Sequence, residues 1–306
     1  MGRRKNKGRA VHGVLLLDKP LKISSNHALQ KVKRLFNAAK AGHTGSLDPL
    51  ASGMLPICLG EATKISAFLL DADKTYRFKC KLGEKTATGD AEGEVIERRP
   101  YAHIQREDIE KHLASLRGDI MQVPPMYSAL KKDGQRLYDL ARQGIEVERK
   151  PRPVSIYSLQ ILSFENAEVE LLARCSKGTY VRTLAEDLGE MLGCGAYVSE
   201  LRRTSVGPFK AEMVSMETLE ALAEQGDREG VYTLDALLLG IDTGIEDWPK
   251  VELDTDSAYY IKLGQPVQVS RAPTEGNVRI YSDSHFIGTG IIQDDGRVAP
   301  KRMMNL

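Results

Sequence analysis

The chain has 306 residues, of which 42% are apolar and 28% are charged, and its formal net charge is +1 at pH 7. This composition is ordinary for a soluble globular protein, and the length accommodates one large domain and one small domain. The longest early apolar run, Val14 to Leu17, is far too short for a signal peptide or a membrane span, so we expect a cytoplasmic protein.

Charge is distributed unevenly along the chain. Residues 1–40 contain eleven Lys or Arg and a single acid, Asp18, whereas residues 211–257 contain thirteen acids and two basic residues. One part of the chain can therefore attract phosphates while another repels them. We expect residues 1–10 to form a disordered basic tail, and such an arm can still contact RNA.

The four cysteines, Cys58, Cys80, Cys175 and Cys194, are far apart in the sequence. They form no C-x-x-C pair, and no histidine or second cysteine stands at metal-ligand spacing from any of them. We therefore interpret them as reduced packing residues and expect no structural zinc.

The first predicted helix begins at Ser25, which we interpret as its cap. Apolar residues follow at helical spacing, while Lys31, Lys33 and Arg34 lie off the apolar face. The pattern indicates an amphipathic helix that packs on a core.

Residues 42–64 read GHTGSLDPLASGMLPICLGEATK and form the most distinctive stretch of the chain. Gly42, Gly45 and Pro49 favour a rigid turn on which Asp48 has a fixed direction. The MLPICLG run then predicts a buried strand, and EATKISAFLL predicts a helix. Because an Asp-Pro step is more often a turn than a catalytic site, these residues alone leave the role of Asp48 open.

Residues 75–82 alternate strictly between apolar and polar side chains, which predicts a half-buried strand. Tyr76 shares the apolar side with Phe78, Cys80 and Leu82. Alternation alone therefore favours Tyr76 as a core aromatic near the start of a strand.

A basic segment and a helix follow. Residues 124–152 contain seven Lys or Arg, which indicates an exposed, partly helical excursion from the sheet, and strands resume over 153–175. Residues 179–192 predict a helix whose apolar stripe is Val181, Leu184, Leu188, Met191 and Leu192. Arg182 lies in its first turn, where a cation is unfavourable with the helix dipole. A special partner or a surface ion pair would explain that position equally well.

From about Thr243 the chain changes to short alternating segments such as QPVQVS and NVRIYS. They predict a small β-rich module that ends at Leu306. The acidic stretch 211–257, which includes the helical METLEALAEQ, would connect this module to the preceding domain.

The GHTGSLDPLASGMLP stretch resembles the second motif, GHTGALDPLATGMLP, of the pseudouridine synthases that act on the T-loop of tRNA. Ser46 and Ser52 are the differing positions. The resemblance continues, in the same order, through VLLLDKPLKISSN, KTYRFKCKLGEKTATGDAEG, MYSALKKDGQRLYDLARQG and SKGTYVRTLAEDLGEMLGCGA, and it covers most of residues 11–207. One departure is that the family's usual T-D-T is Thr86-Ala87-Thr88 here, although Asp90 is kept, so a role of the missing acid does not carry over.

The resemblance implies roles for named residues. Asp48 would be the nucleophile, Arg182 would hold its carboxylate ionised and aimed, and Tyr76 would stack on the uracil and relay a proton. His43 would occupy the place of the extruded base, Tyr180 and Leu201 would line the pocket, and Lys19 would have a structural or phosphate-binding role. The basic insertion would contact RNA through Lys131, Lys132, Arg149 and Lys150.

The implied fold is an α/β (α+β) pseudouridine synthase domain over residues 11–242, with a mixed, largely antiparallel sheet and an RNA-binding insertion at 124–152. A small β-rich, PUA-like RNA-binding domain would occupy residues 243–306. The implied activity is the isomerisation of uridine 55 in the T-loop of tRNA after base flipping, without metal or cofactor. We expect a monomer that recognises the tRNA T-stem-loop without a guide RNA, an obligate protein partner or a membrane.

Several alternatives stay open on the sequence. Asp48 could attack the sugar or the uracil ring, or it could act at the sugar through a glycal route. A guide-dependent relative would share the catalytic motifs, and a noncatalytic RNA-folding factor would share the basic surfaces. The GHTG segment could also suggest a nucleotidyl transferase, but no second His-x-Gly-His element and no phosphate-binding loop accompany it.

Overall fold

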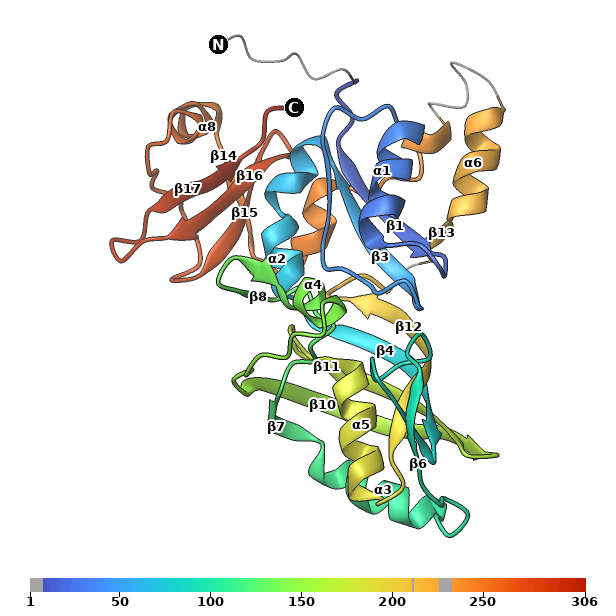
Figure 1. Cartoon of the computed structure of the whole chain (residues 1–306). Helices are drawn as coiled ribbons and strands as arrows, with labels where there is room; N and C mark the ends of the chain where they lie inside the picture. The colour runs from blue at the N-terminus through green and yellow to red at the C-terminus, as the bar shows by residue number, and fades with distance from the viewer. Residues whose placement is uncertain (1–7, 211, 226–232) are drawn as a thin grey trace.

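The computed structural model describes residues 8–210, 212–225 and 233–306. Within these residues, the large domain is built on a nine-stranded sheet in the order β13-β1-β3-β12-β4-β11-β10-β7, with β2 paired to β3 (Figure 1). The strands are β1 (Gly13–Lys19), β2 (Ala41–His43), β3 (Ala51–Leu59), β4 (Lys74–Leu82), β7 (Gly118–Gln122), β10 (Arg152–Glu165), β11 (Glu168–Cys175), β12 (Ala196–Val206) and β13 (Val214–Ser215). Most neighbours are antiparallel, but β12 runs parallel to β3 and β13 runs parallel to β1. The predicted mixed, largely antiparallel fold is confirmed.

Two pairs of helices cover the two halves of this sheet (Figure 1). Helices α1 (Ser25–Leu35) and α6 (Met216–Glu224) pack beside β1 and β3, and α3 (Arg106–Ser115) and α5 (Val181–Met191) pack beside β10 and β12. The predicted stripe of α5 is buried at Val181, Leu184 and Leu188, but Met191 is 42% exposed. That part of the prediction was wrong because the last turn of α5 reaches the surface, where the Met191 sulfur lies 3.7 Å from the Ser115 hydroxyl of α3.

The helix start near residue 25 differs from the prediction in one respect. Ser24 is the N-cap, since its hydroxyl accepts a hydrogen bond from the His27 amide at 3.1 Å. Ser25 is instead buried inside the first turn and is only 3% exposed. The two adjacent serines therefore have separate functions, which spacing alone does not distinguish.

The strand predictions around the glycine-rich stretch are confirmed, but the single helix predicted after β3 is divided. A 3-10 helix η1 (Gly60–Lys64) precedes the short α2 (Ser66–Asp71). Hydroxyls of Thr63 and Ser66 donate to carbonyls three residues back, at 2.8 Å each. Such local bonds compete with a regular helix and favour tighter turns. On β4, Phe78, Cys80 and Leu82 are buried as predicted, and all four cysteines are free and buried.

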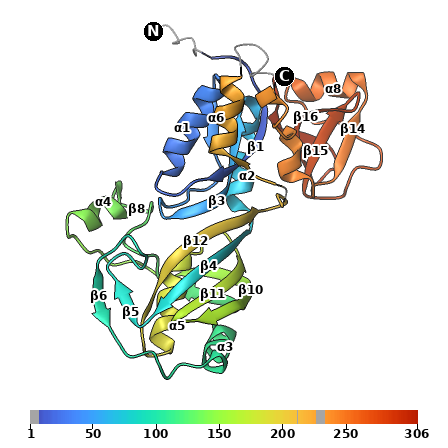
Figure 2. The same ribbon diagram turned by 90° about the vertical axis from the view of Figure 1, so that its right-hand side faces the viewer.

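The predicted basic excursion forms a hairpin and a short helix that stand off the large domain (Figure 2). Its elements are β8 (Lys131–Lys132), β9 (Gln135–Arg136) and α4 (Leu137–Arg142). A second hairpin, β5 (Glu84–Thr86) with β6 (Val95–Arg98), carries the Thr86 to Gly93 turn toward β12, to which Asp90 is bridged. Both excursions border the loop between β2 and β3.

The C-terminal module is a four-stranded sheet with one helix, as its alternating segments predicted. Its elements are β14 (Lys250–Leu253), α8 (Thr255–Lys262), β15 (Asn277–Ser282), β16 (His285–Ile292) and β17 (Val298–Met303). Tyr281 and Phe286 join one apolar cluster with Ile65 and Leu69 of the large domain, together with Ile245 of the 3-10 helix η2 (Ile241–Ile245). The module is therefore docked against η1 and α2 rather than attached by a free linker.

Residues 1–7 of the predicted basic tail lie outside the described part of the chain. Arg9, by contrast, is bound: its guanidinium donates to the Asp235 carboxylate at 2.6 Å and to the Phe36 carbonyl at 2.8 Å. None of the helices in the described residues is long and apolar enough to cross a membrane.

A buried lysine joins α2 to the strand that carries Tyr76. Lys74 is 7% exposed, and its ammonium donates to the carbonyls of Leu70 at 2.7 Å and Ala72 at 2.5 Å, at the end of α2. A cation at this position compensates the partial negative charge of the helix terminus. Burial, and secondarily the positive charge of Arg203, lowers the pKa of Lys74 from 10.5 to about 8.

We predict that this lysine makes stability depend on pH. Because its pKa is lower in the folded chain, the unfolded chain binds more protons between pH 8 and 10.5, and stability rises with pH across that window. The free energy of unfolding of the wild type should therefore rise by about 2 kcal/mol relative to Lys74→Met between about pH 7.5 and pH 9.5. Urea denaturation at both pH values measures this free energy, with the exposed Lys111→Met as the control. An equal pH dependence of the unfolding free energy in wild type and Lys74→Met would contradict the prediction.

Candidate active site

Asp48 lies in the loop between β2 and β3, at the wall of a cavity of about 180 Å³. The cavity is built by the loop, β4, β12, the start of α5 and the base of the basic insertion. Its lining residues are Ser46, Leu47, Asp48, Tyr76, Ser128, Ala129, Thr179, Tyr180, Val181, Arg182 and Leu201. The structure therefore brings together the predicted residues Asp48, Tyr76, Arg182, Tyr180 and Leu201, which are widely separated in the sequence.

Arg182 is the charged centre of this site. Its side chain is only 6% exposed, and its two terminal nitrogens reach the Asp48 carboxylate at 3.0 Å and the Asp90 carboxylate at 3.2 Å. The same nitrogens donate to the carbonyls of Tyr127 at 2.7 Å and Thr88 at 3.1 Å. These acceptors explain a cation in the first turn of α5, which the helix dipole alone disfavours.

The pKa of Asp48 is raised above its usual value, with burial as the largest cause. Its side chain is 45% accessible at the mouth of the cavity, but the surrounding walls still desolvate the carboxylate. The Arg182 guanidinium opposes this rise, whereas the Asp90 carboxylate adds to it. Arg182 thus favours the ionised form of Asp48 against the effect of burial.

Asp90 is a member of the site to which sequence reasoning gave no role. It is 2% exposed, and its carboxylate accepts hydrogen bonds from the Thr88 hydroxyl and, at 3.1 Å, from the Glu92 amide. The available signal was that Asp90 persists in a motif where the family's other acid is replaced by Ala87. A carboxylate with these donors is held rigidly against Arg182.

Tyr76 projects into the cavity from β4. Burial raises the pKa of its phenol, and the Arg203 guanidinium beside it acts in the opposite direction. Tyr180 is the N-cap of α5, where the Gln122 side chain accepts from its amide at 2.7 Å and donates to its carbonyl at 3.1 Å. Gln122 is 2% exposed and was not singled out in the sequence, because an amide at the end of a strand has no distinctive pattern.

Two of the residues assigned to substrate binding lie deeper than expected. Lys19 is fully buried, and its ammonium donates to the carbonyls of Pro20 and Ile23, at 2.8 Å each. Of the two roles considered for Lys19, this geometry favours the structural one and leaves no free ammonium for a phosphate. His43 ends β2 half-buried, and burial lowers the pKa of its imidazole, which favours the neutral form.

The cations of the insertion are unequally available. Lys131, Lys132 and Lys150 are exposed. Arg149 is partly buried and donates to the Pro124 carbonyl at 3.3 Å and to the Glu146 carboxylate at 3.1 Å. Arg149 therefore fastens the base of the insertion, whereas the three lysines remain open to solvent.

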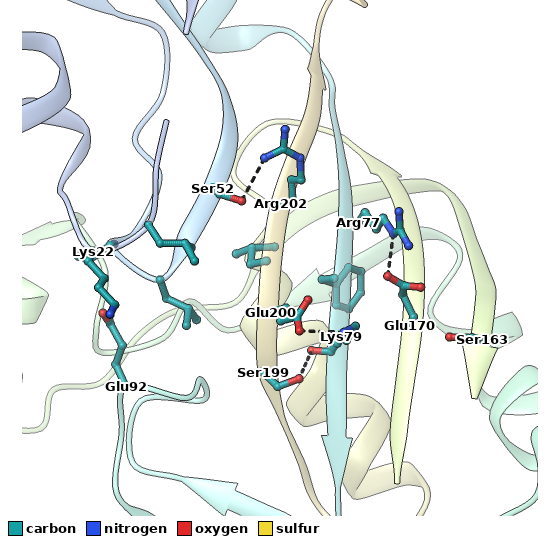
Figure 3. A pocket seen from close by; sticks show the side chains of 15 residues that line it. Lys22, Ser52, Arg77, Lys79, Glu92, Ser163, Glu170, Ser199, Glu200 and Arg202 are labelled. Atoms are coloured by element: carbon teal, nitrogen blue, oxygen red, sulfur yellow. Dashed lines mark hydrogen bonds and ion pairs between the residues drawn. The ribbon is translucent and has the colours of Figure 1, made fainter. Parts of the chain in front are cut away.

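A second hollow, of about 770 Å³, lies where Leu21, Lys22 and Leu50 approach β4, β11 and β12 (Figure 3). On its sheet wall Arg77 pairs with Glu170 at 2.7 Å and Lys79 with Glu200 at 2.8 Å, and Arg202 pairs with Asp18 of β1 at 2.7 Å. On β4 these side chains alternate with Tyr76 and so point away from the Asp48 cavity. Asp48, Tyr76 and Arg182 line the smaller cavity instead.

Comparisons with known proteins agree with this geometry. Three family profiles match the chain: TruB family pseudouridylate synthase (N terminal domain) over residues 33–181, tRNA pseudouridylate synthase B C-terminal domain over 182–246, and Pseudouridine synthase II TruB, C-terminal, over 249–304. A protein of Serratia proteamaculans (strain 568) named tRNA pseudouridine synthase B is 54% identical, across 99% of this chain and 98% of its own length. The chain belongs to the TruB family of pseudouridylate synthases. A relative of the same name from Stutzerimonas stutzeri (strain A1501) is 56% identical, across 97% of this chain and 96% of its own length.

Solved structures place this TruB-family chain in the pseudouridine synthase fold. An H/ACA RNP bound to a substrate RNA containing 2'-deoxyuridine includes a chain that matches with a TM-score of 0.72 and 22% identity, over 100% of this chain and 92% of the other. A Cbf5-Nop10-Gar1 complex gives the same TM-score at 24% identity, over 95% of this chain and 84% of the other. At this identity the likeness concerns the fold alone.

We predict that the two neighbours of Asp48 shift its titration in opposite directions. Asp90→Asn removes a negative charge and should lower the pKa of Asp48, whereas Arg182→Met removes a positive charge and should raise it. Carboxyl carbon chemical shifts in aspartate-labelled protein measure both midpoints, with Asp48→Asn identifying the resonance. Shifts in the same direction would contradict the electrostatic roles given to Asp90 and Arg182.

Proposed function

We propose that this chain isomerises uridine 55 in the T-loop of tRNA to pseudouridine, with Asp48 as the nucleophile and without a guide RNA. Membership of the TruB family, and the names of relatives that match over nearly the whole chain, support tRNA pseudouridylation as the reaction. The observation that carries the mechanism is the Asp48 carboxylate held by the buried Arg182 in a small cavity that also contains Tyr76.

The size of the cavity constrains how a substrate enters it. About 180 Å³ suits a single base but not a base pair, so the target uridine has to leave its stack before it reacts. Unstacking costs about a few kcal/mol, which contacts elsewhere on the RNA must offset. His43 lies in the strand that leads into the Asp48 loop, and we propose that it takes the place of the extruded base in the T-loop.

The chemistry requires breaking the bond between sugar and base, rotating the uracil and joining it through a ring carbon. An ionised Asp48 is the nucleophile in this proposal, and Arg182 keeps it ionised and aimed. Tyr76 stacks on the uracil and relays the proton that leaves the ring carbon when the new bond is complete. Attack on the sugar, attack on the uracil and a glycal route all fit this arrangement.

Recognition of the tRNA stem is assigned to the basic insertion, with the C-terminal module as a PUA-like second RNA-binding surface. The exposed Lys131, Lys132 and Lys150 suit phosphate contacts, while Tyr180 and Leu201 line the pocket. Because the insertion supplies its own cations beside the site, a guide RNA is unnecessary in this proposal. We further propose that the enzyme works as a cytoplasmic monomer.

The deciding experiment maps pseudouridine in an unmodified tRNA transcript incubated with wild type or Asp48→Asn, without metal or guide RNA. We expect the wild type to convert the T-loop uridine. Asp48→Asn should bind the transcript almost normally and convert none, because the substitution removes the charge and keeps the shape. Equal loss of binding and activity would contradict the assigned role of Asp48. Binding without conversion by the wild type would favour an RNA-folding factor.

We predict that the three exposed lysines of the insertion contribute through counterion release. The triple variant Lys131→Gln, Lys132→Gln, Lys150→Gln should weaken tRNA binding and reduce the slope of log Kd against log salt concentration by about 1 for each phosphate that is no longer neutralised. Filter binding at several salt concentrations measures the Kd for tRNA and this slope. Lys111→Gln on α3 is the control. An unchanged slope would mean that the insertion does not touch phosphates.

A further inference from the structure

Arg203 of β12 is a buried cation that the mechanism above does not use. It is 1% exposed and is the largest of the fully buried side chains. Among the described residues no carboxylate lies within ion-pair distance of it, in contrast to Arg182 with its two acids. An uncompensated buried charge is costly, so its presence needs a specific set of acceptors.

Two backbone carbonyls supply those acceptors. The Arg203 Nε donates to the Met54 carbonyl at 2.7 Å, and a terminal nitrogen donates to the Gly45 carbonyl at 3.0 Å. Gly45 and Met54 lie on opposite sides of Asp48 in the sequence. A single guanidinium therefore ties the loop before Asp48 and the strand β3 after it to β12, where its planar fork matches two diverging acceptors.

The backbone of Arg203 approaches the same loop closely. Gly53 pairs with Arg203 between the parallel strands β3 and β12, and it has a φ of +99°. A Cβ at Gly53 would lie 2.2 Å from the Arg203 carbonyl oxygen. Only glycine permits this spacing. Arg203 therefore holds the segment around Asp48 in two ways, by its backbone against Gly53 and by its guanidinium on Gly45 and Met54.

Ser25 provides a second tie, directly beside Asp48. Its buried hydroxyl accepts from the Leu47 amide at 2.7 Å and donates to the Leu47 carbonyl at 2.9 Å. Leu47 immediately precedes Asp48, so the hydroxyl satisfies both polar groups of the adjoining peptide units. Its side chain comes from α1, an element separate from those that hold Arg203.

We propose that Arg203 and Ser25 are positioning residues that hold the loop from Gly45 to Met54 in the geometry required for Asp48 to react. This inference rests on the proposed function and assigns two further residues to it. Neither side chain lines the cavity. Ser25 acts through the backbone that carries Asp48, and Arg203 holds the same backbone while its guanidinium also lies beside the Tyr76 phenol. A displacement of about 1 Å at a reacting group can lower a rate about 100-fold without changing the contacts that hold the rest of the substrate.

The adjacent serines of α1 offer a matched test. Ser25→Ala removes the tie to Leu47, whereas Ser24→Ala removes the helix cap and touches no part of the loop. We expect Ser25→Ala to lower the single-turnover rate of pseudouridine formation at least about tenfold, with the Kd for tRNA changed less than about twofold. Ser24→Ala should lower the melting temperature and leave the rate unchanged. Equal rates for Ser25→Ala and wild type would overturn the role of Ser25.

Arg203→Lys tests the other tie, because it keeps the charge but cannot present a fork to both carbonyls. We again expect a lower rate with an unchanged Kd, and Ser25→Cys repeats the test near Leu47 with little change in volume. A Kd that weakens in parallel with the rate would overturn the positioning role. If Arg203→Lys does not fold, the Ser25 variants decide the proposal.

Hydrogen exchange of the segment from Gly45 to Met54 gives a readout that does not depend on activity. This segment should exchange faster in Ser25→Ala and Arg203→Lys than in wild type, and Ser24→Ala should match the wild type there. Unchanged exchange in both tie variants would overturn the proposal. An inactive wild type would refute the proposed function, and exchange would still show whether these residues hold the loop.

Discussion

The ion-pair network of Arg182 is the interaction on which the architecture of the site depends. Three segments distant in sequence meet at one guanidinium: the loop with Asp48, the hairpin turn with Asp90 and the base of the basic insertion at Tyr127. A buried arginine left without its acceptors is strongly unfavourable, so each segment has to be in place for the others to be stable there. The Asp48 carboxylate and the base of the basic insertion are consequently parts of one electrostatic unit.

The two buried arginines, Arg182 and Arg203, act on different titratable groups of the site. Arg182 has two carboxylates, and its fork holds that of Asp48 at the mouth of the cavity. Arg203 donates to two backbone carbonyls and pairs with no carboxylate among the described residues, and its charge opposes the burial-driven rise in the pKa of Tyr76 and adds to the fall in the pKa of His43. One cation thus opposes the rise in the pKa of a carboxylate, while the other favours a neutral imidazole and opposes the rise in the pKa of a phenol.

The features that could be predicted from the sequence are those that depend on a local pattern of residues. Alternation over β4, the apolar run of β3 and the glycine-rich segment around Asp48 gave correct elements, because side-chain period and backbone freedom are properties of contiguous residues. The family resemblance supplied the set of Asp48, Tyr76 and Arg182, which the structure gathers in one cavity.

The sequence pattern could not predict which residues meet in the folded chain. Asp90 stood in a recognised motif without a role because its contact with Arg182 joins residues 92 positions apart, which spacing cannot show. Ser25 was interpreted as a cap because it and Ser24 have the same propensity, and only the position of Leu47 distinguishes them. Lys19 was considered for phosphate binding, yet its ammonium is enclosed by its own turn. In each case the deciding contact comes from the folded chain.

The docked position of the C-terminal module would restrict which RNAs the proposed enzyme accepts. Two hydrogen bonds hold its end against η1. The Lys64 ammonium donates to the Met303 carbonyl at 2.7 Å, and the Asn305 backbone amide donates to the Glu61 carboxylate at 2.8 Å. The shared apolar cluster adds to these contacts. The distance between this module and the Asp48 cavity is therefore fixed by the docking contacts. In the proposed function, an RNA that engages both would have to present its target uridine at a matching distance from its second contact, so its three-dimensional shape would be tested along with its local sequence.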